Sequence, residues 1–99
     1  MNRANYSYTI KNVQGRNVIS IIDHYSDSFP TKTVTNDIEN VLKDIANAEG
    51  ISPKEYLVVY RDSDNDWAQY DVVNDDFYFI ADSEEEVITL AIKKQLDLL

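Results

Sequence analysis

The chain contains no cysteine, only two glycines and two prolines, and no long hydrophobic run. Without cysteine it has no disulfides, no thiolate chemistry and no cysteine-ligated metal site, and its composition is compatible with a reducing cytosol. The longest apolar stretch, Val18 to Ile22, is interrupted by Ser20 and is far shorter than the ~20 residues that span a bilayer. The segment from Met1 to Tyr6 lacks the apolar core of a signal peptide. We therefore expect a cytoplasmic protein that does not bind membranes.

The scarcity of glycine and proline also argues against a disordered or low-complexity chain. Of the 99 residues, 43% are hydrophobic and 11% are aromatic, which is enough to build one compact core. The sequence shows no internal repeat. We predict a single domain that spans residues 1–99.

Lysine and arginine are absent from one long window, Asp62 to Ile92, which contains ten carboxylates. The remainder of the chain has eight acids and nine bases, so this window accounts for the entire negative net charge of -9. A charge asymmetry of this size repels the phosphates of nucleic acids and membranes and attracts basic surfaces. We therefore expect the partner to be a basic protein surface, and neither nucleic acid nor membrane.

Hydrophobic periodicity predicts five strands and two helices. Alternation with a period of two, or a β-branched run, indicates a strand, whereas an apolar stripe that recurs every three to four residues indicates a helix. The predicted strands are 6–10, 18–22, 57–60, 67–73 and 77–81, a single helical turn is expected at 52–55, and the helices begin after 35 or 36 and after 83. This order, ββαβββα, predicts an α+β fold in two layers: a mostly antiparallel sheet with two helices on one face.

Both predicted helices have end signals in the sequence. Asn36 with Glu39 three residues later resembles a capping box, and Ser83 with Glu86 repeats the pattern. Gly50 lies where a left-handed residue ends a helix. These signals set both predicted ends of the first helix and the predicted start of the second.

The acidic window also contains aromatic residues, which leads to a docking hypothesis. Ordinary surfaces mix charges of both signs, whereas a field of one sign usually steers a partner, and tryptophan and tyrosine anchor interfaces. We predict a non-catalytic protein-binding module in which an acidic meander, residues 62–82, docks a basic partner. The predicted partner-binding residues are Asp62, Asp64, Asp66, Trp67, Tyr70, Asp71, Asp75 and Asp76.

Two other interpretations of the carboxylates stay open. If they are spaced like phosphates, the protein is a DNA mimic that inhibits a nucleic-acid-binding protein, and its binding weakens steeply with salt. Alternatively, they serve solubility and local structure only. Glu84 to Glu86 complement the dipole of the second helix, and aspartates in turns bond to the nearby backbone.

Metal and catalytic motifs are weak. The loop 62–66 has carboxylates at positions 1, 3 and 5, as an EF-hand calcium loop does, but its sixth position is Trp67 instead of glycine. A weak surface calcium site is the most that this loop indicates. His24 is the only histidine, and its neighbour Asp23 would point to the opposite face of a strand. We predict no catalytic residue, no metal site and no cofactor, with a small hydrolase that uses His24 as the alternative.

Several short motifs between residues 24 and 73 resemble a pattern in a group of small bacterial proteins of uncharacterised function. They are His24-Tyr25-Ser26-Asp27, Thr33-Val34-Thr35-Asn36 followed by Glu39, Gly50-Ile51-Ser52-Pro53, Val59-Tyr60-Arg61-Asp62 and Tyr70-Asp71-Val72-Val73. Members of the group often have Glu and His before the tyrosine of the strand, where this chain has Val58 and Val59. The resemblance implies no activity. It does imply that Thr35, Asn36, Glu39 and Tyr60 belong to one arrangement.

Overall fold

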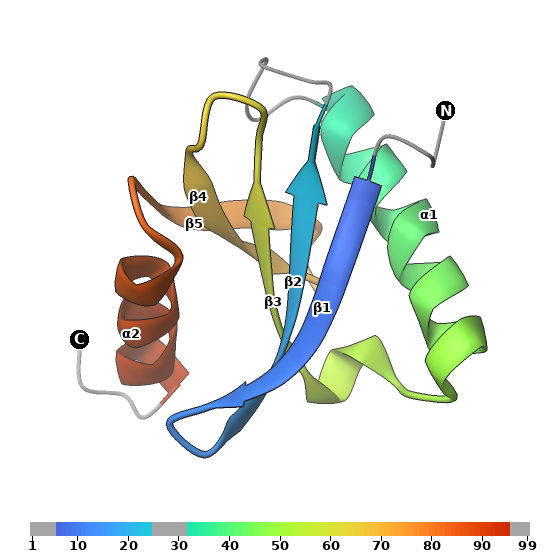
Figure 1. Ribbon diagram of the computed structural model, residues 1–99, viewed down its shortest axis with the longest axis horizontal. Helices are drawn as coiled ribbons and strands as arrows, with labels where there is room; N and C mark the ends of the chain where they lie inside the picture. Colours follow the sequence, from blue (N-terminus) through green and yellow to red (C-terminus); the bar gives the residue numbers. More distant parts are fainter. Residues whose placement is uncertain (1–5, 25–31, 96–99) are drawn as a thin grey trace.

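The computed structural model describes the backbone of residues 6–24 and 32–95 and the side chains of 6–24 and 36–95. Within these ranges the elements follow the predicted ββαβββα order, with a short 3-10 turn before the third strand (Figure 1). This confirms the α+β class. The bounds are β1 Tyr6–Val13, β2 Arg16–Asp23, α1 Lys32–Glu49, η2 Pro53–Glu55, β3 Leu57–Arg61, β4 Trp67–Asp71, β5 Asp76–Ala81 and α2 Glu84–Gln95.

The strands form one sheet in the order β1-β2-β3-β4-β5. Neighbouring strands are antiparallel except β2 and β3, which are parallel. The exception arises because α1 carries the chain from the end of β2 back to the start of β3, whereas the other pairs are joined by short turns or loops (Figure 1). The sheet is therefore mostly antiparallel, as predicted, and β1 and β5 form its two edges.

The two helices cover opposite faces of the sheet. Ile19 and Ile21 of β2 pack in one buried cluster with Ile38 of α1, whereas Val18 of β2 packs in a second cluster with Val87 of α2. The prediction of both helices on one face, in two layers, is therefore wrong. Because successive side chains of a strand point to opposite faces, the continuous apolar runs of the central strands bury both faces, and each face requires its own helix.

Two of the three helix ends that the sequence predicted agree with the structure. Gly50 ends α1 with a φ of +65°, and the side chain of Ser83 accepts a hydrogen bond from the amide of Glu86 at the start of α2. α2 begins at Glu84, as predicted. In contrast, α1 begins at Lys32, so Asn36 lies inside the helix and is not its cap. The capping-box prediction at this residue is wrong because the helix extends one turn further toward its N-terminus than the apolar stripe indicated.

Candidate protein-binding surface

The loop between β3 and β4 is organised around a buried carboxylate. Asp62 is 1% exposed, and its Oδ1 accepts hydrogen bonds from the backbone amides of Asp64 at 2.9 Å and Asp66 at 3.0 Å. Its Oδ2 is also buried and has no hydrogen-bond partner within the described part of the chain. Asp62 therefore shapes the loop from inside and is not part of an exposed docking surface.

The turn between β4 and β5 uses its carboxylates in the same way. Oδ1 of Asp71 accepts hydrogen bonds from the amides of Val73 and Asn74, and its Oδ2 accepts one from the Asn74 side chain. Partial burial works to raise the pKa of Asp71, but these hydrogen bonds outweigh it and hold the pKa below its usual value. Asp75 accepts a hydrogen bond from the hydroxyl of Tyr70. The two carboxylates thus have local structural roles.

The two aromatic anchors predicted for docking have different environments. Tyr70 is only 2% exposed and belongs to the cluster beneath α1, so it cannot reach a partner. Trp67 is partly exposed and packs against the cluster beneath α2. It lies opposite Arg61 of β3 and Ala81 of β5 in the sheet. Trp67 therefore marks the end of the β4–β5 hairpin that adjoins the 62–66 loop.

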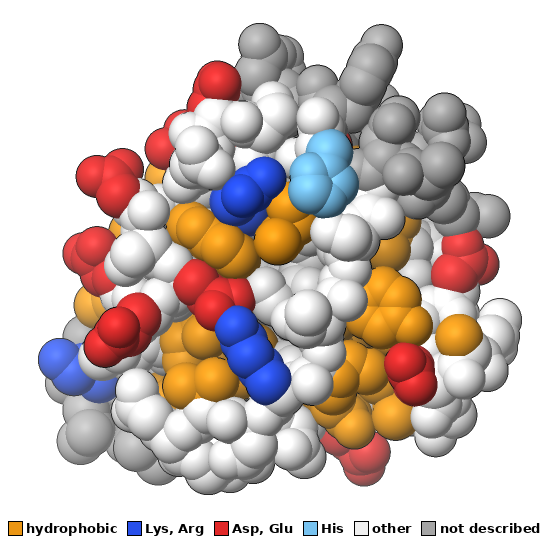
Figure 2. Space-filling view, viewed as in Figure 1, with side chains coloured by type: hydrophobic (Ala, Val, Ile, Leu, Met, Phe, Trp, Pro, Cys, Tyr) orange, Lys and Arg blue, Asp and Glu red, His pale blue; other side chains and the backbone are white. Residues whose placement is uncertain are grey.

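Carboxylates from three segments lie toward this end of the hairpin. Since Trp67 pairs with Ala81, the residues that flank them, Asp66 and Asp82, lie beside each other, and the first turn of α2 follows at once. Figure 2 shows acidic side chains along this margin, over the β3–β4 loop and α2. We call this surface the acidic edge. Its members, all at least partly exposed, are Asp64, Asp66, Asp82, Glu85 and Glu86.

The structure therefore separates the carboxylates predicted to act together. Asp64 and Asp66 belong to the acidic edge, whereas Asp71, Asp75 and Asp76 lie at the opposite end of the β4–β5 hairpin. Asp76 is exposed and accepts a hydrogen bond from the amide of Phe77. Sequence reasoning assigned Glu85 and Glu86 to helix capping alone and so missed them here. Their place on the same margin as the 62–66 loop depends on strand pairing that no local pattern reveals.

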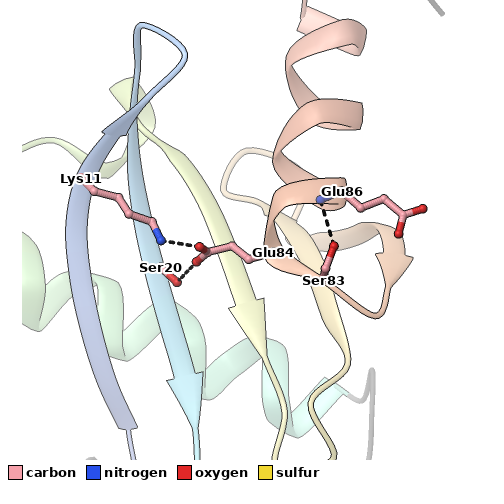
Figure 3. Close-up of polar contacts among 5 residues, drawn as sticks. All are labelled: Lys11, Ser20, Ser83, Glu84 and Glu86. Carbon is pink, nitrogen blue, oxygen red and sulfur yellow. Dashed lines mark hydrogen bonds and ion pairs between the residues drawn. The ribbon is translucent and has the colours of Figure 1, made fainter.

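Glu84 differs from its two neighbours because it points inward to the sheet. Its carboxylate bonds both the ammonium group of Lys11 on β1 and the hydroxyl of Ser20 on β2 (Figure 3). Glu84 thereby fixes the start of α2 against two strands and leaves the outward positions of that turn to Glu85 and Glu86. Arg61, next to the edge, donates through Nε to the carbonyl of Asp62 at 3.1 Å.

His24 and Asp23 lie apart, as the strand geometry predicted. The Nε2 of His24 lies 2.9 Å from Oγ of Ser7, and both residues are exposed on the α2 face. Asp23 is 1% exposed on the other face and accepts a hydrogen bond of 2.8 Å from the hydroxyl of Tyr60. Neither contact was anticipated from the sequence. The one signal in the sequence that Asp23 is buried was its position at the end of a central β-branched strand.

The buried Asp23 forms the centre of a tyrosine cluster. Burial, and then the hydrogen bond and the charge of Asp23, raise the pKa of Tyr60 far above its usual value. Burial, the charges of Asp23 and Asp37, and a hydrogen bond to Asp23 raise the pKa of Tyr6. The hydroxyl of Tyr60 thus bonds Asp23, whereas Asn36 and Glu39 of α1 are exposed. The side chain of Thr35, the fourth member of the arrangement implied by the resemblance, lies outside the described residues.

No cation site or membrane segment accompanies this surface in the described part of the chain. Residues 6–24 and 32–95 contain no group of three or more acidic or histidine side chains placed to hold a metal ion. No helix in the same ranges is both long enough and apolar enough to cross a bilayer. No protein-family model, curated protein or solved structure shows a significant match to this chain.

Proposed function

We propose that the protein is a non-catalytic binding module that docks a basic protein surface through the acidic edge. The observation that carries the proposal is the convergence of exposed carboxylates from the β3–β4 loop, the end of β5 and the first turn of α2. The window from Asp62 to Ile92, which supplies all of them, contains no lysine or arginine. A field of one sign at one end of a small domain steers an oppositely charged partner and fixes its orientation.

The neighbourhood of the acidic edge supports docking rather than solubility alone. Trp67 keeps part of its ring exposed beside the carboxylates, and Ile80 of the edge strand β5 is 58% exposed. Protein interfaces combine apolar or aromatic centres with a charged rim. We also propose that the protein is cytoplasmic, a location with which its lack of cysteine is compatible.

A comparison of two variants with equal net charge tests the proposal. The edge variant carries Asp64→Asn, Asp82→Asn, Glu85→Gln and Glu86→Gln. The control variant carries Glu39→Gln, Asp44→Asn, Glu49→Gln and Glu55→Gln, which are exposed carboxylates elsewhere on the molecule. The probe is decalysine, titrated against the protein while the fluorescence of Trp67, the single tryptophan, is recorded.

We expect the edge variant to bind decalysine about tenfold more weakly than wild type, since four exposed ion pairs at ~0.2 to 1 kcal/mol each are removed. The control variant should lose much less affinity for decalysine. Equal weakening in the two variants would show that decalysine responds only to net charge, and the docking proposal would then be abandoned. Binding should also weaken as salt is raised.

DNA mimicry is the more specific form of the same proposal and has its own test. Proteins captured from a lysate by the wild type, and not by the edge variant, are challenged with short duplex DNA. Release by DNA would identify the occupied surface of the partner as a DNA-binding groove. Retention would assign the acidic edge to ordinary protein docking.

The contact between Ser7 and His24 supports one candidate from another class, a small hydrolase. The distance of 2.9 Å between Oγ and Nε2 is that of a nucleophile and its general base. Both side chains are exposed on the open surface of the sheet, whereas hydrolases enclose this pair in a pocket with donors for an oxyanion. Loss of p-nitrophenyl acetate hydrolysis in both Ser7→Ala and His24→Ala would support the enzyme. Unchanged hydrolysis in the two variants would reject it.

A further inference from the structure

The two edges of the sheet differ in their ability to pair with another strand. In β5 the residues Phe79 and Ile80 oppose the single residue Ala68, and Phe79 has a φ of +58°. Such a bulge interrupts the hydrogen-bonding edge and is a common protection against pairing. In contrast, β1 is in unbroken register with β2 over all eight residues from Tyr6 to Val13. Within residues 6–24 and 32–95, the β1 edge alone therefore presents a regular strand.

The turn at the end of β1 fixes which backbone groups face outward. Gln14 and Gly15 both have positive φ, at +54° and +83°, as in the two-residue type I′ hairpin turn, and Val13 pairs with Arg16 across it. In such a turn the flanking pair, Val13 and Arg16, is hydrogen-bonded, and antiparallel pairs then alternate between hydrogen-bonded and non-hydrogen-bonded positions. The backbone groups of Val13 and of every second residue before it therefore bond to β2. The N–H and C=O groups of the intervening residues, Tyr8 and Ile10 among them, then point to the free edge.

The side chains at the middle of β1 are exposed and nearly neutral. Tyr8 and Ile10 are each 38% exposed and lie on the α1 face of the strand. The Tyr8 hydroxyl donates a 3.1 Å hydrogen bond to Glu49 at the end of α1, which holds the ring in place. Lys11 is the one charged residue of β1, and it is paired with Glu84 (Figure 3). Few charges oppose the approach of a second apolar strand at this edge.

We propose that the β1 edge joins two copies of this chain, antiparallel, with Thr9 on the two-fold axis. This register places Tyr8 of each copy opposite Ile10 of the other, with the outward N–H and C=O groups of both in bonding positions. The result is two aromatic–β-branched cross-strand pairs, which are among the favourable combinations in sheets. A two-fold interface requires such self-complementarity. The inference does not depend on the proposed function.

The sheet topology also explains why a second copy fits here better than the basic partner does. β1 and β5 are opposite margins of the sheet, and Asp66 and Asp82 of the acidic edge lie on the β5 side. The first turn of α2 lies over the face of the sheet, where Glu84 reaches Lys11 of β1. Pairing through β1 therefore keeps the β3–β4 loops and the Asp82 side chains of the two copies apart, although each copy has a net charge of -9. The dimer would present the β3–β4 loop and Asp82 of each copy to basic partners, toward the two ends of a ten-stranded sheet.

The first experiment is sedimentation of the wild type over a range of concentrations and salt. An interface of one strand pair is small, so we expect a dissociation constant on the order of 0.1 mM. Raised salt should increase the dimer fraction, because it screens repulsion between two acidic copies. This is opposite to the salt dependence expected for decalysine binding, so failure of one proposal is distinguishable from failure of the other. A monomer at every concentration would overturn the inference.

Two matched isoleucines test the location of the interface. Ile10→Lys places a charge on the β1 edge, and Ile80→Lys places the same charge on the β5 edge, where the side chain is already exposed. We expect Ile10→Lys to weaken dimerisation about tenfold, since both cross-strand pairs are lost at ~0.2 to 1 kcal/mol each and a charge is added. Ile80→Lys should leave dimerisation unchanged. The reverse result would place the interface on β5 and overturn the inference.

The register is tested by disulfide formation, for which the cysteine-free chain is a clean background. In the proposed register Thr9→Cys brings two cysteines together across the axis at the short separation that a disulfide requires. Ser7→Cys is the control, because residue 7 then lies opposite residue 11 and the two cysteines are several residues apart. Rapid oxidation of Thr9→Cys alone to a covalent dimer is expected. Equal or faster crosslinking of Ser7→Cys would refute the register.

Discussion

The buried bond between Tyr60 and Asp23 gives the sharpest prediction about stability. Both residues are at most 1% exposed, and the hydroxyl donates to Oδ2 of Asp23 at 2.8 Å. Tyr60→Phe keeps the ring and deletes only the donor. Because a buried acceptor then loses a hydrogen bond that water cannot replace, we expect the free energy of unfolding at pH 7 to fall by ~2 kcal/mol.

Tyr70→Phe provides the matched control. Tyr70 also donates to an aspartate, but its acceptor Asp75 is partly exposed, so water can replace the lost donor. We expect Tyr70→Phe to cost less than about 1 kcal/mol. Urea unfolding is followed by the fluorescence of the single tryptophan, Trp67, which packs against the cluster beneath α2. Equal losses in the two variants would contradict the assignment of the larger effect to burial.

The pH dependence of the same pair of proteins gives a second readout. The pKa of Tyr60 is raised in the folded state, so above the usual pKa of ~10 the unfolded chain loses the phenol proton while the folded chain keeps it. The unfolded state then binds fewer protons, and stability falls as pH rises, by ~1.4 kcal/mol per pH unit for each such tyrosine. Tyr60→Phe lacks one of these groups. The free energy of unfolding of Tyr60→Phe should therefore be lower than that of wild type by ~2 kcal/mol at pH 7 but by less than ~1 kcal/mol at pH 11. A deficit that is the same at both pH values would refute the reasoning.

Three further predictions concern the turn between β4 and β5 and the ends of the two helices. Asp71→Ala should lower the free energy of unfolding by ~1 kcal/mol at pH 7. This difference should shrink as the pH falls through the lowered pKa of Asp71, because the carboxylate stabilises the fold only while it is ionised. Urea unfolding at neutral and at acidic pH measures it. Gly50→Ala should lower the free energy of unfolding by ~1 kcal/mol through backbone strain alone, because φ is +65° and an added Cβ would meet no atom within 4 Å. Gly50→Asn should lower it less, since asparagine tolerates this conformation better, and thermal unfolding compares the two. Glu84→Gln should cost ~1 kcal/mol by weakening the bond to Lys11 across partly buried surface, and the loss should diminish in urea unfolding at high salt.

Local patterns were sufficient for the elements and their order. The alternation of Tyr6, Tyr8 and Ile10, the β-branched run from Val18 and the positions of Gly50 and Ser83 each depend on neighbours within a few residues. Such short-range rules remain valid in the folded protein unless packing overrides them. The start of α1 was the exception, because the apolar stripe is visible only where the helix faces the core, and the first turn precedes that stripe.

The candidate site was only partly readable from the chain. Charge counting located the acidic window, in which Asp64 is exposed and Asp66 is partly exposed. Asp62 and Tyr70 are buried instead. An aspartate in a turn has the same local sequence whether its carboxylate faces solvent or the loop amides, so its exposure could not be read from the residues around it.

The sequence by itself determined the single-sign charge of residues 62–92, the five strands and two helices, and the absence of cysteine chemistry, because these follow from composition and short-range periodicity. The tertiary structure alone decided that the helices cover opposite faces and that Glu84 turns inward to Lys11. It also decided that carboxylates from three segments lie along one margin of the molecule. These outcomes depend on which strands pair and in what register. Strand pairing joins residues far apart in the chain, and its energy comes from the burial of both faces at once, which no local stretch of sequence contains.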